Sequence, residues 1–158
     1  MSLLVKKFGG SSLATVDHIQ RIAQHILDEK SLGHDIVVVV SAMQGVTENL
    51  IKLASEISLT PNLREYDALL ATGESASTAL LSMALIAKSC PAVSLNARQL
   101  RILTNNQHKY AHIQTLELAN LKRQLQSGKV PVITGFQGVN EFNEMTTLDR
   151  GHGVFMNT

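Results

Sequence analysis

Residues 35–41 read DIVVVVS, and this run is the most restrictive feature of the 158-residue sequence. Its five consecutive apolar residues are all β-branched, and branching at Cβ favours an extended strand over a helix. A strand without polar alternation is buried on both faces, which is typical of a parallel sheet covered by helices. The run therefore predicts an α/β protein.

Strand-like and helix-like patterns alternate along the rest of the chain. Further strands are predicted at residues 3–8, 92–95 and 130–134. Helices are predicted at residues 16–27, 48–58, 62–88 and 113–127. This alternation predicts a single domain with a mainly parallel sheet.

Composition and charge exclude several classes of function. The chain has 14 Lys and Arg residues against 13 Asp and Glu residues and few aromatic residues, which argues against nucleic-acid binding. Its most apolar stretch, residues 68–87, contains Glu74 and several Ser and Thr residues, so a buried helix is expected there and not a membrane span. The single cysteine, Cys90, and the lack of a signal-peptide pattern favour a cytoplasmic protein.

Three predicted strands end in turns of small residues. GGSS follows residues 3–8, SAMQGVT follows residues 35–40, and GFQG follows residues 130–134. Because the carboxyl ends of neighbouring parallel strands meet at one edge of a sheet, these turns are expected to line one pocket. Glycine-rich turns and helix N-termini present backbone N–H groups, so an anion site is predicted there.

Two charged residues are candidates for this pocket. Lys7 directly precedes the glycine pair of the first turn, although no GxxxxGK[ST] pattern is present. Glu74 is the only charged residue between Asp67 and Lys88, and a carboxylate in an apolar helix is costly unless it is paired or faces a wet cavity. Each residue also has an interpretation without a functional role. Lys7 could be an ordinary solvated lysine at a strand end, and the helix could simply touch solvent at Glu74.

The histidines and the cysteine do not form a recognisable metal or nucleophile motif. His108 and His112 are four residues apart, but no third ligand accompanies them in the sequence, so no metal site is predicted. Cys90 precedes a proline at a predicted helix end and is expected to be a buried, inert thiol.

Five segments resemble, in the same order, motifs of the aspartate kinases in the amino acid kinase family. They are VKKFGGSSLA, VVVVSAMQGVT, TGESAS, VPVITGFQG and TTLDRGHG. The resemblance implies the three-layer αβα sandwich of that family. It also implies transfer of the γ-phosphoryl group of ATP to the side-chain carboxylate of L-aspartate, the first step of lysine, threonine and methionine biosynthesis. ATP and Mg²⁺ are implied cofactors, and neither is expected to be tightly bound.

The same resemblance assigns roles to residues of each motif. The implied catalytic residue is Lys7, which would stabilise charge on the transferred phosphoryl group. The implied phosphate-binding residues are Gly9, Gly10, Ser11 and Gly45. The implied substrate-binding residues are Ser41, Thr47, Glu74 and Arg150. Glu74 would bind the α-ammonium group of aspartate and Arg150 its α-carboxylate, because a planar guanidinium suits a planar anion.

The last motif departs from the family's pattern. Asp149 and His152 replace glycines on either side of Arg150, and Gly153 and Val154 stand where the family has serine and aspartate. Asp149 would add negative charge beside Arg150 and weaken carboxylate binding.

In the family, this loop is followed by the half that binds the nucleotide and then by regulatory domains. Residues 1–158 are therefore expected to be the N-terminal, substrate- and phosphate-binding part of a truncated kinase domain, inactive alone. Such a part would expose apolar surface, so a homo-oligomer or a complex with a second chain is expected.

Two alternatives stay open. The chain could be a non-catalytic module that binds an amino acid or phosphate, or that assembles with another chain. It could also be a related kinase, for acetylglutamate or glutamate, that shares the glycine turns. SAMQGVT and TTLDRG favour an aspartate kinase over the related kinases, whereas the short length favours the module over independent catalysis.

Overall fold

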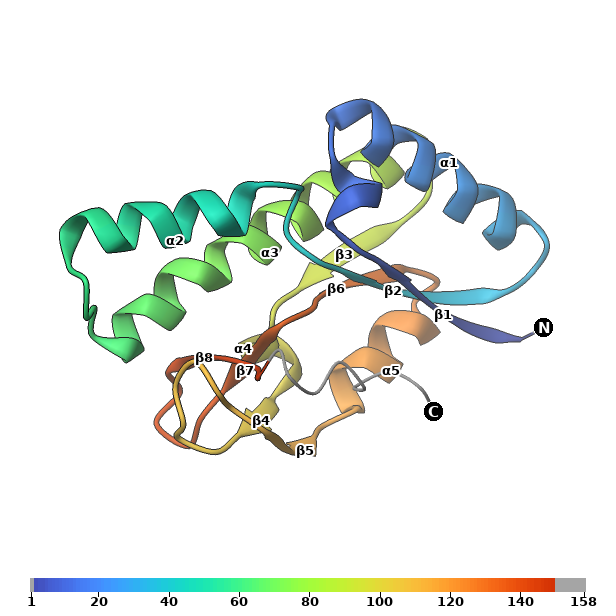
Figure 1. The fold of residues 1–158 in the computed structure, drawn as a ribbon. Helices are drawn as coiled ribbons and strands as arrows, with labels where there is room; N and C mark the ends of the chain where they lie inside the picture. Colours follow the sequence, from blue (N-terminus) through green and yellow to red (C-terminus); the bar gives the residue numbers. More distant parts are fainter. Residues whose placement is uncertain (1, 150–158) are drawn as a thin grey trace.

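The structure is a computed structural model that describes residues 2–149 (Figure 1). Its strands are β1 (Leu3–Phe8), β2 (Asp35–Val40), β3 (Ala92–Leu95), β4 (Ile102–Thr104), β5 (Ile113–Leu116), β6 (Val130–Thr134), β7 (Gln137–Val139) and β8 (Met145–Thr147). Its α-helices are α1 (Val16–Ser31), α2 (Val46–Ile57), α3 (Leu63–Ala87), α4 (Ala97–Leu100) and α5 (Ala119–Gln126), and a 3-10 turn, η1, covers Gly10–Leu13.

Four strands form a parallel sheet in the order β1-β2-β6-β3, here called sheet A. The apolar run of β2 lies between β1 and β6 and is fully buried, as the sequence predicts. Phe8 pairs with Val40, and Val40 pairs with Thr134. The three strands therefore end level with one another, and their following turns meet at one edge of the sheet.

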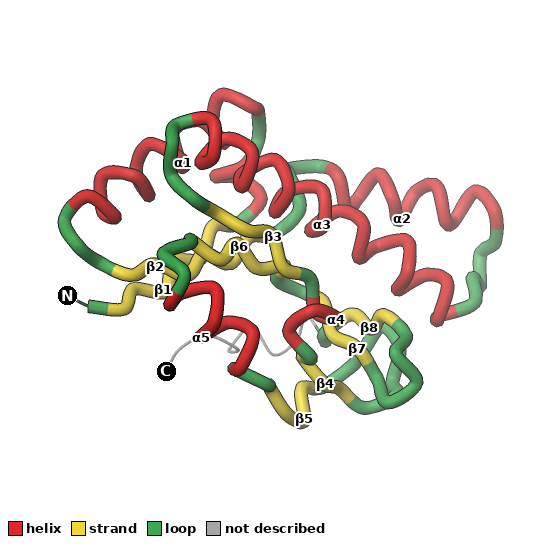
Figure 2. The backbone as a smooth tube through the Cα atoms, turned by 180° about the vertical axis from the view of Figure 1, so that it is seen from behind, coloured by secondary structure: helices red, strands yellow, loops and turns green. Residues whose placement is uncertain are grey.

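Helices cover both faces of sheet A (Figure 2). On one face, the alternate residues Ile36, Val38 and Val40 of β2 pack against apolar residues of α1 and α3. On the other face, Val37 and Val39 belong to a second cluster that includes residues of α4 and α5. The predicted α/β fold, a three-layer αβα sandwich with a mainly parallel sheet, is confirmed.

A second sheet of four short strands was not predicted from the sequence. In this sheet B the order is β5-β4-β7-β8, with an antiparallel pair at each end. The helix predicted over residues 113–127 is wrong in its first part, where Ile113–Leu116 forms β5 and pairs with β4. Helix α5 begins only at Ala119. Pairing with β4 overrides the predicted helix only in residues 113–116, whereas Leu121 and Leu125 of the predicted helical stripe lie in α5.

Helix α3 runs without interruption through Gly73, which the pattern marks as a weak point. A Cβ atom at Gly73 would lie 2.9 Å from the Cβ atom of Ala42, so the missing side chain allows the loop after β2 to approach the helix. By length and composition α3 could cross a membrane, but more than half of its most apolar stretch is buried inside the protein, as in a core helix.

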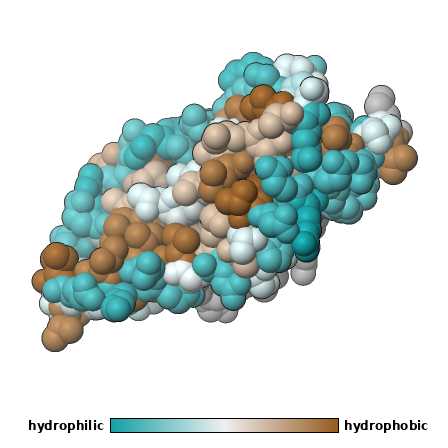
Figure 3. All heavy atoms as spheres, turned by 90° about the horizontal axis from the view of Figure 1, so that it is seen from above, coloured by the Kyte–Doolittle hydropathy of each residue, from teal (hydrophilic) through white to brown (hydrophobic). Residues whose placement is uncertain are grey.

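The helical side of the molecule carries apolar patches on its surface (Figure 3). Exposed large apolar side chains on α2, on α3 and in the segment between them include Leu53, Ile57, Leu59, Leu80, Met83 and Ile86. The expected exposure of apolar surface is therefore present on this side. The association of this apolar surface with another chain stays a prediction.

Candidate functional site

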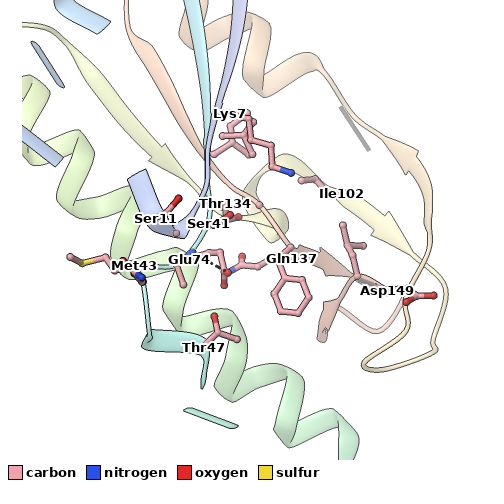
Figure 4. Close-up of a pocket in the computed structure, with 18 of the residues that line it drawn as sticks. Lys7, Ser11, Ser41, Met43, Thr47, Glu74, Ile102, Thr134, Gln137 and Asp149 are labelled. Atoms are coloured by element: carbon pink, nitrogen blue, oxygen red, sulfur yellow. Dashed lines mark hydrogen bonds between the residues drawn. The ribbon is translucent and has the colours of Figure 1, made fainter. Parts of the chain in front are cut away.

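A cavity of about 550 Å³ lies where β1, β2 and β6 end (Figure 4). It is bounded by the three turns that follow these strands, by α3 and by sheet B. Seven of the predicted residues line it: Lys7, Gly10, Ser11, Ser41, Gly45, Thr47 and Glu74. Gly9 adjoins the cavity only through the neighbouring Gly10, and Arg150 lies outside the described residues.

Strand alternation places Lys7 at this cavity. The preceding Lys6 points to the opposite face of β1, where its Nζ atom lies 3.1 Å from Glu29 Oε1 of α1. The turn after Lys7 is anchored by Leu13, which is completely buried. Gly10 lies close to the β2 side of the cavity, because a Cβ atom there would be 3.4 Å from the carbonyl oxygen of Ala42.

The loop after β2 leads into the N-terminus of α2. Gly45 caps this helix with a φ of 83°, a left-handed conformation that strains other residues. Thr47 in the first turn is buried. Because the first N–H groups of a helix lack partners within the helix, this end of α2 presents donors and partial positive charge at the cavity. Glu48 also lines the cavity and is exposed.

Glu74 is buried at the cavity wall, with only 3% of its surface exposed. Its Oε1 atom accepts a hydrogen bond from the backbone N–H of Ala42, at 3.2 Å. The close approach at Gly73 brings this loop within reach. The alternative that α3 merely touches solvent at Glu74 is therefore wrong.

A second buried carboxylate, Asp67, lies about two turns before Glu74 on α3. Its oxygens accept from Lys109 N (3.0 and 3.1 Å), Thr147 N (3.0 Å) and Thr147 Oγ1 (2.6 Å), and lie 2.9 Å from His108 Nδ1. These bonds fasten sheet B and residues 108–109 to α3. Because β8 continues into Leu148 and Asp149, which line the cavity, Asp67 supports one of its walls.

Several cavity residues were not predicted from the sequence. Thr134 is the last residue of β6, and Gln137 belongs to the GFQG segment that follows, which was predicted as a turn. The others belong to sheet A, to sheet B or to the segments around it: Val39, Ile102, Ile113, Leu116, Ile133, Phe136, Leu148 and Asp149. Alternation along β6 could have identified Thr134. The residues of sheet B could not be identified, because its strands are too short to show a strand pattern in the sequence.

Cys90 and Glu144 lie away from the cavity and have shifted pKa values. Burial raises the pKa of the Cys90 thiol, and Cys90 is 3% exposed, which confirms the prediction of a buried thiol. The pKa of Glu144 is lowered by a hydrogen bond from Asn140 and by Arg64. Among residues 2–149, no group of three His, Cys, Asp or Glu side chains could hold a metal ion.

The sequence profile of the amino acid kinase family matches residues 2–152. The chain belongs to the amino acid kinase family. Among curated relatives of this chain, an aspartate kinase of Stutzerimonas stutzeri and aspartokinase 2 of Bacillus subtilis are each 47% identical over 151 residues. These residues are 96% of this chain and 37% of each relative, so the chain spans about 37% of their length.

Solved structures agree with this assignment. The aspartate kinase of Synechocystis superposes with a TM-score of 0.80 at 42% identity, over 94% of this chain and 24% of that one. Aspartokinase III of E. coli, solved in complex with aspartate and ADP, has a TM-score of 0.79 at 23% identity, over 96% of this chain and 44% of that one. The second likeness shows the fold alone.

Proposed function

We propose that this chain is the aspartate- and phosphate-binding part of an aspartate kinase. The observation that carries the proposal is that Lys7, Thr47 and Glu74, from β1, α2 and α3, line one cavity. Relatives that are 47% identical and named aspartate kinases support L-aspartate as the substrate over acetylglutamate or glutamate. The proposed reaction converts ATP and L-aspartate into ADP and 4-phospho-L-aspartate.

Glu74 would bind the α-ammonium group of aspartate. A buried carboxylate is costly unless a cation or donors compensate it, and an ammonium group supplies both charge and donors. Arg150 would bind the α-carboxylate; it directly follows Asp149 of the cavity wall in the sequence. Thr47 and Ser41 would then line the substrate between these two groups.

Lys7 and the backbone N–H groups around Gly10, Ser11 and Gly45 would hold phosphate oxygens. The lysine ammonium and the N-terminus of α2 both favour anions. The attacking group is the side-chain carboxylate of the substrate, so the chain needs no general base. Its contribution to the rate is alignment of the reactants and neutralisation of the charge that develops on the phosphoryl group.

The phosphate end of the cavity fits the phosphates of ATP, which supplies the transferred phosphoryl group when bound. Within the described part of the chain, no cluster of three potential metal ligands is present. Mg²⁺ would be held mainly by the phosphates of the nucleotide and would neutralise part of their charge, since it is commonly bound by substrate phosphates with few protein ligands.

Two assays of the purified 158-residue chain test this proposal. Isothermal titration with L-aspartate should show binding to one site, and no heat at millimolar aspartate would contradict the proposal. ATP-dependent formation of aspartyl hydroxamate measures turnover. Because the chain spans about 37% of its relatives, we expect binding without turnover, and clear hydroxamate formation would show that these residues suffice for catalysis.

A second candidate is a non-catalytic module that acts in an assembly. The apolar side chains exposed on α2 and α3 support association with a second copy or a second chain. Analytical ultracentrifugation of the chain at increasing concentration tests self-association. A monomer throughout the micromolar range would contradict it.

A further inference from the structure

Gln137, the first residue of β7, is 1% exposed and lines the cavity. Its Nε2 group donates hydrogen bonds to the backbone oxygen of Ala71 and to Ser75 Oγ, the latter at 3.1 Å, and both acceptors belong to α3. Its Oε1 atom has no hydrogen-bond partner within residues 2–149. A buried acceptor without a donor is unfavourable, so a ligand that brings a donor would be stabilised there.

The bond to Ala71 determines which way the Gln137 amide faces. A backbone carbonyl can only accept a hydrogen bond, so the NH₂ group of Gln137 must face it. A flipped amide would place two acceptors against each other. The carbonyl oxygen is therefore the group that Gln137 has available for a ligand, and this oxygen can only accept.

Glu74 provides a second acceptor at the same wall. Ser75, which holds the Gln137 amide, is the next residue after Glu74 on α3. Both Glu74 and Gln137 are almost fully buried and both line the cavity (Figure 4). A carboxylate beside an amide carbonyl suits a ligand group that carries positive charge and several N–H donors. A primary ammonium, with three donors, has these properties.

Resting on the proposed function, we infer that Gln137 Oε1 is a second acceptor for the α-ammonium group of the substrate, beside the carboxylate of Glu74. This pair makes the site select a free α-amino group over an acylated or a missing one. An N-acyl group has a single N–H and no charge, so it could not bond to Gln137 Oε1 and to the Glu74 carboxylate together. Sites built to hydrogen-bond a group strongly reject analogues that lack it.

The test compares L-aspartate with succinate, which lacks only the amino group, by isothermal titration. The wild-type chain should bind aspartate at least tenfold more tightly than succinate. Gln137→Met retains a side chain of similar length but removes Oε1, and should weaken aspartate binding about tenfold while leaving succinate binding unchanged. Ser75→Ala is the matched control, because it removes a partner of Nε2 and leaves Oε1 in place. It should keep the wild-type ratio of the two affinities.

A general loss of packing would lower the affinities for aspartate and succinate together. A change in the ratio of the two affinities therefore indicates a lost contact with the ammonium group and not a damaged fold. If Gln137→Met does not fold, the wild-type chain is titrated with N,N,N-trimethyl-aspartate, which keeps the charge but has no donors. The inference expects at least tenfold weaker binding than aspartate, and equal binding overturns it.

The outcomes also separate this inference from the proposed function. An unchanged aspartate-to-succinate ratio in folded Gln137→Met overturns the inference alone. If the wild-type chain prefers L-glutamate, and Gln137→Met loses discrimination between glutamate and glutarate, the substrate assignment is wrong and the inference holds. If the chain binds neither amino acid, both are overturned.

Discussion

Helix α3 carries two buried carboxylates, Asp67 and Glu74, but the surroundings of the two groups differ. Asp67, near the start of the helix, is completely buried and receives hydrogen bonds from a loop and from β8 of sheet B. Glu74, near the middle, is bonded to Ala42 of the loop after β2 and lines the cavity. The difference indicates that Asp67 holds the structure together, whereas Glu74 lies at the cavity, where we propose that it binds a ligand.

This comparison shows why a buried charge alone does not identify a binding residue. Both groups pay a desolvation cost that the protein must offset. At Asp67, backbone and side-chain donors of the protein offset it. At Glu74, the N–H of Ala42 donates one hydrogen bond, and the adjoining cavity gives a ligand access to the carboxylate. Burial and the source of the compensating donors have to be considered together.

The largest expected effect is on stability, at Asp67. Asp67→Ala leaves the buried donors of Thr147 without an acceptor and removes the bonds from Lys109 N, and breaking such a network costs about 3–5 kcal/mol. Urea denaturation followed by circular dichroism measures this loss. The exposed Asp17→Ala is the matched control and should change the free energy of unfolding by less than about 0.5 kcal/mol. A loss below about 1 kcal/mol at Asp67 would remove the structural role assigned to it.

The second effect is on ligand affinity, at Glu74. Glu74→Ala should weaken L-aspartate binding by about 10- to 100-fold, because a charge-assisted hydrogen bond contributes about 1.5–3 kcal/mol. Phosphate binding should not change, since Lys7 and the turns supply that part of the cavity. Isothermal titration with each ligand measures both affinities. Equal losses for aspartate and phosphate would mean that the cavity has collapsed and that Glu74 has no separate role.

The third effect concerns the contact between α3 and the loop after β2. Gly73→Ala should favour the helix by up to about 1 kcal/mol through propensity. The added Cβ atom would meet that of Ala42 at 2.9 Å, and overpacking costs about 1–3 kcal/mol. We expect net destabilisation and weaker aspartate binding, because the Glu74–Ala42 contact is displaced. Thr72→Ala, on the exposed side of the helix, is the control and should leave both unchanged or slightly improved. Stabilisation by Gly73→Ala would show that the contact is not tight.

The smallest effect is a pH dependence at the Asp67 end. Hydrogen bonding by Asn140 and Arg64 lowers the folded-state pKa of Glu144. Glu144 therefore stabilises the fold above its unfolded pKa, and this stability is lost as the pH falls through its folded pKa. Glu144→Gln should lose slightly less stability than the wild type on acidification from pH 6 to pH 3. The exposed Glu56→Gln is the control, and thermal unfolding across this range measures both. If Glu144→Gln lost more stability than the wild type between pH 6 and pH 3, the stabilising role assigned to the Glu144 carboxylate would be wrong.

Sheet A and its edge could be predicted because their signals are local. The apolar run of β2 required a buried parallel strand, and the three small-residue turns then had to share an edge. Glu74 stood out as a single charge in an apolar segment. These patterns made Lys7 and Glu74 candidates for the cavity without knowledge of any long-range contact, and the family resemblance added Thr47.

Sheet B, Asp67 and Gln137 could not be predicted in the same way. The strands of sheet B have three or four residues each, and they form through pairing between distant segments, as between Ile102 and Leu116. Asp67 looked like an ordinary charge near a helix start, because its partners at residues 108, 109 and 147 are far away in sequence. Gln137 belongs to a GFQG segment that predicts a turn, but it begins β7 and is buried against α3.

The central claim is that the turns after β1, β2 and β6 form one ligand site. Amide chemical-shift mapping by NMR, with L-aspartate and phosphate titrated into the ¹⁵N-labelled chain, tests it most directly. The claim predicts that amides in residues 9–12, 41–47 and 135–137 shift together and titrate with a single dissociation constant for each ligand. Shifts confined to one of these turns, or no shifts at millimolar ligand, would contradict it.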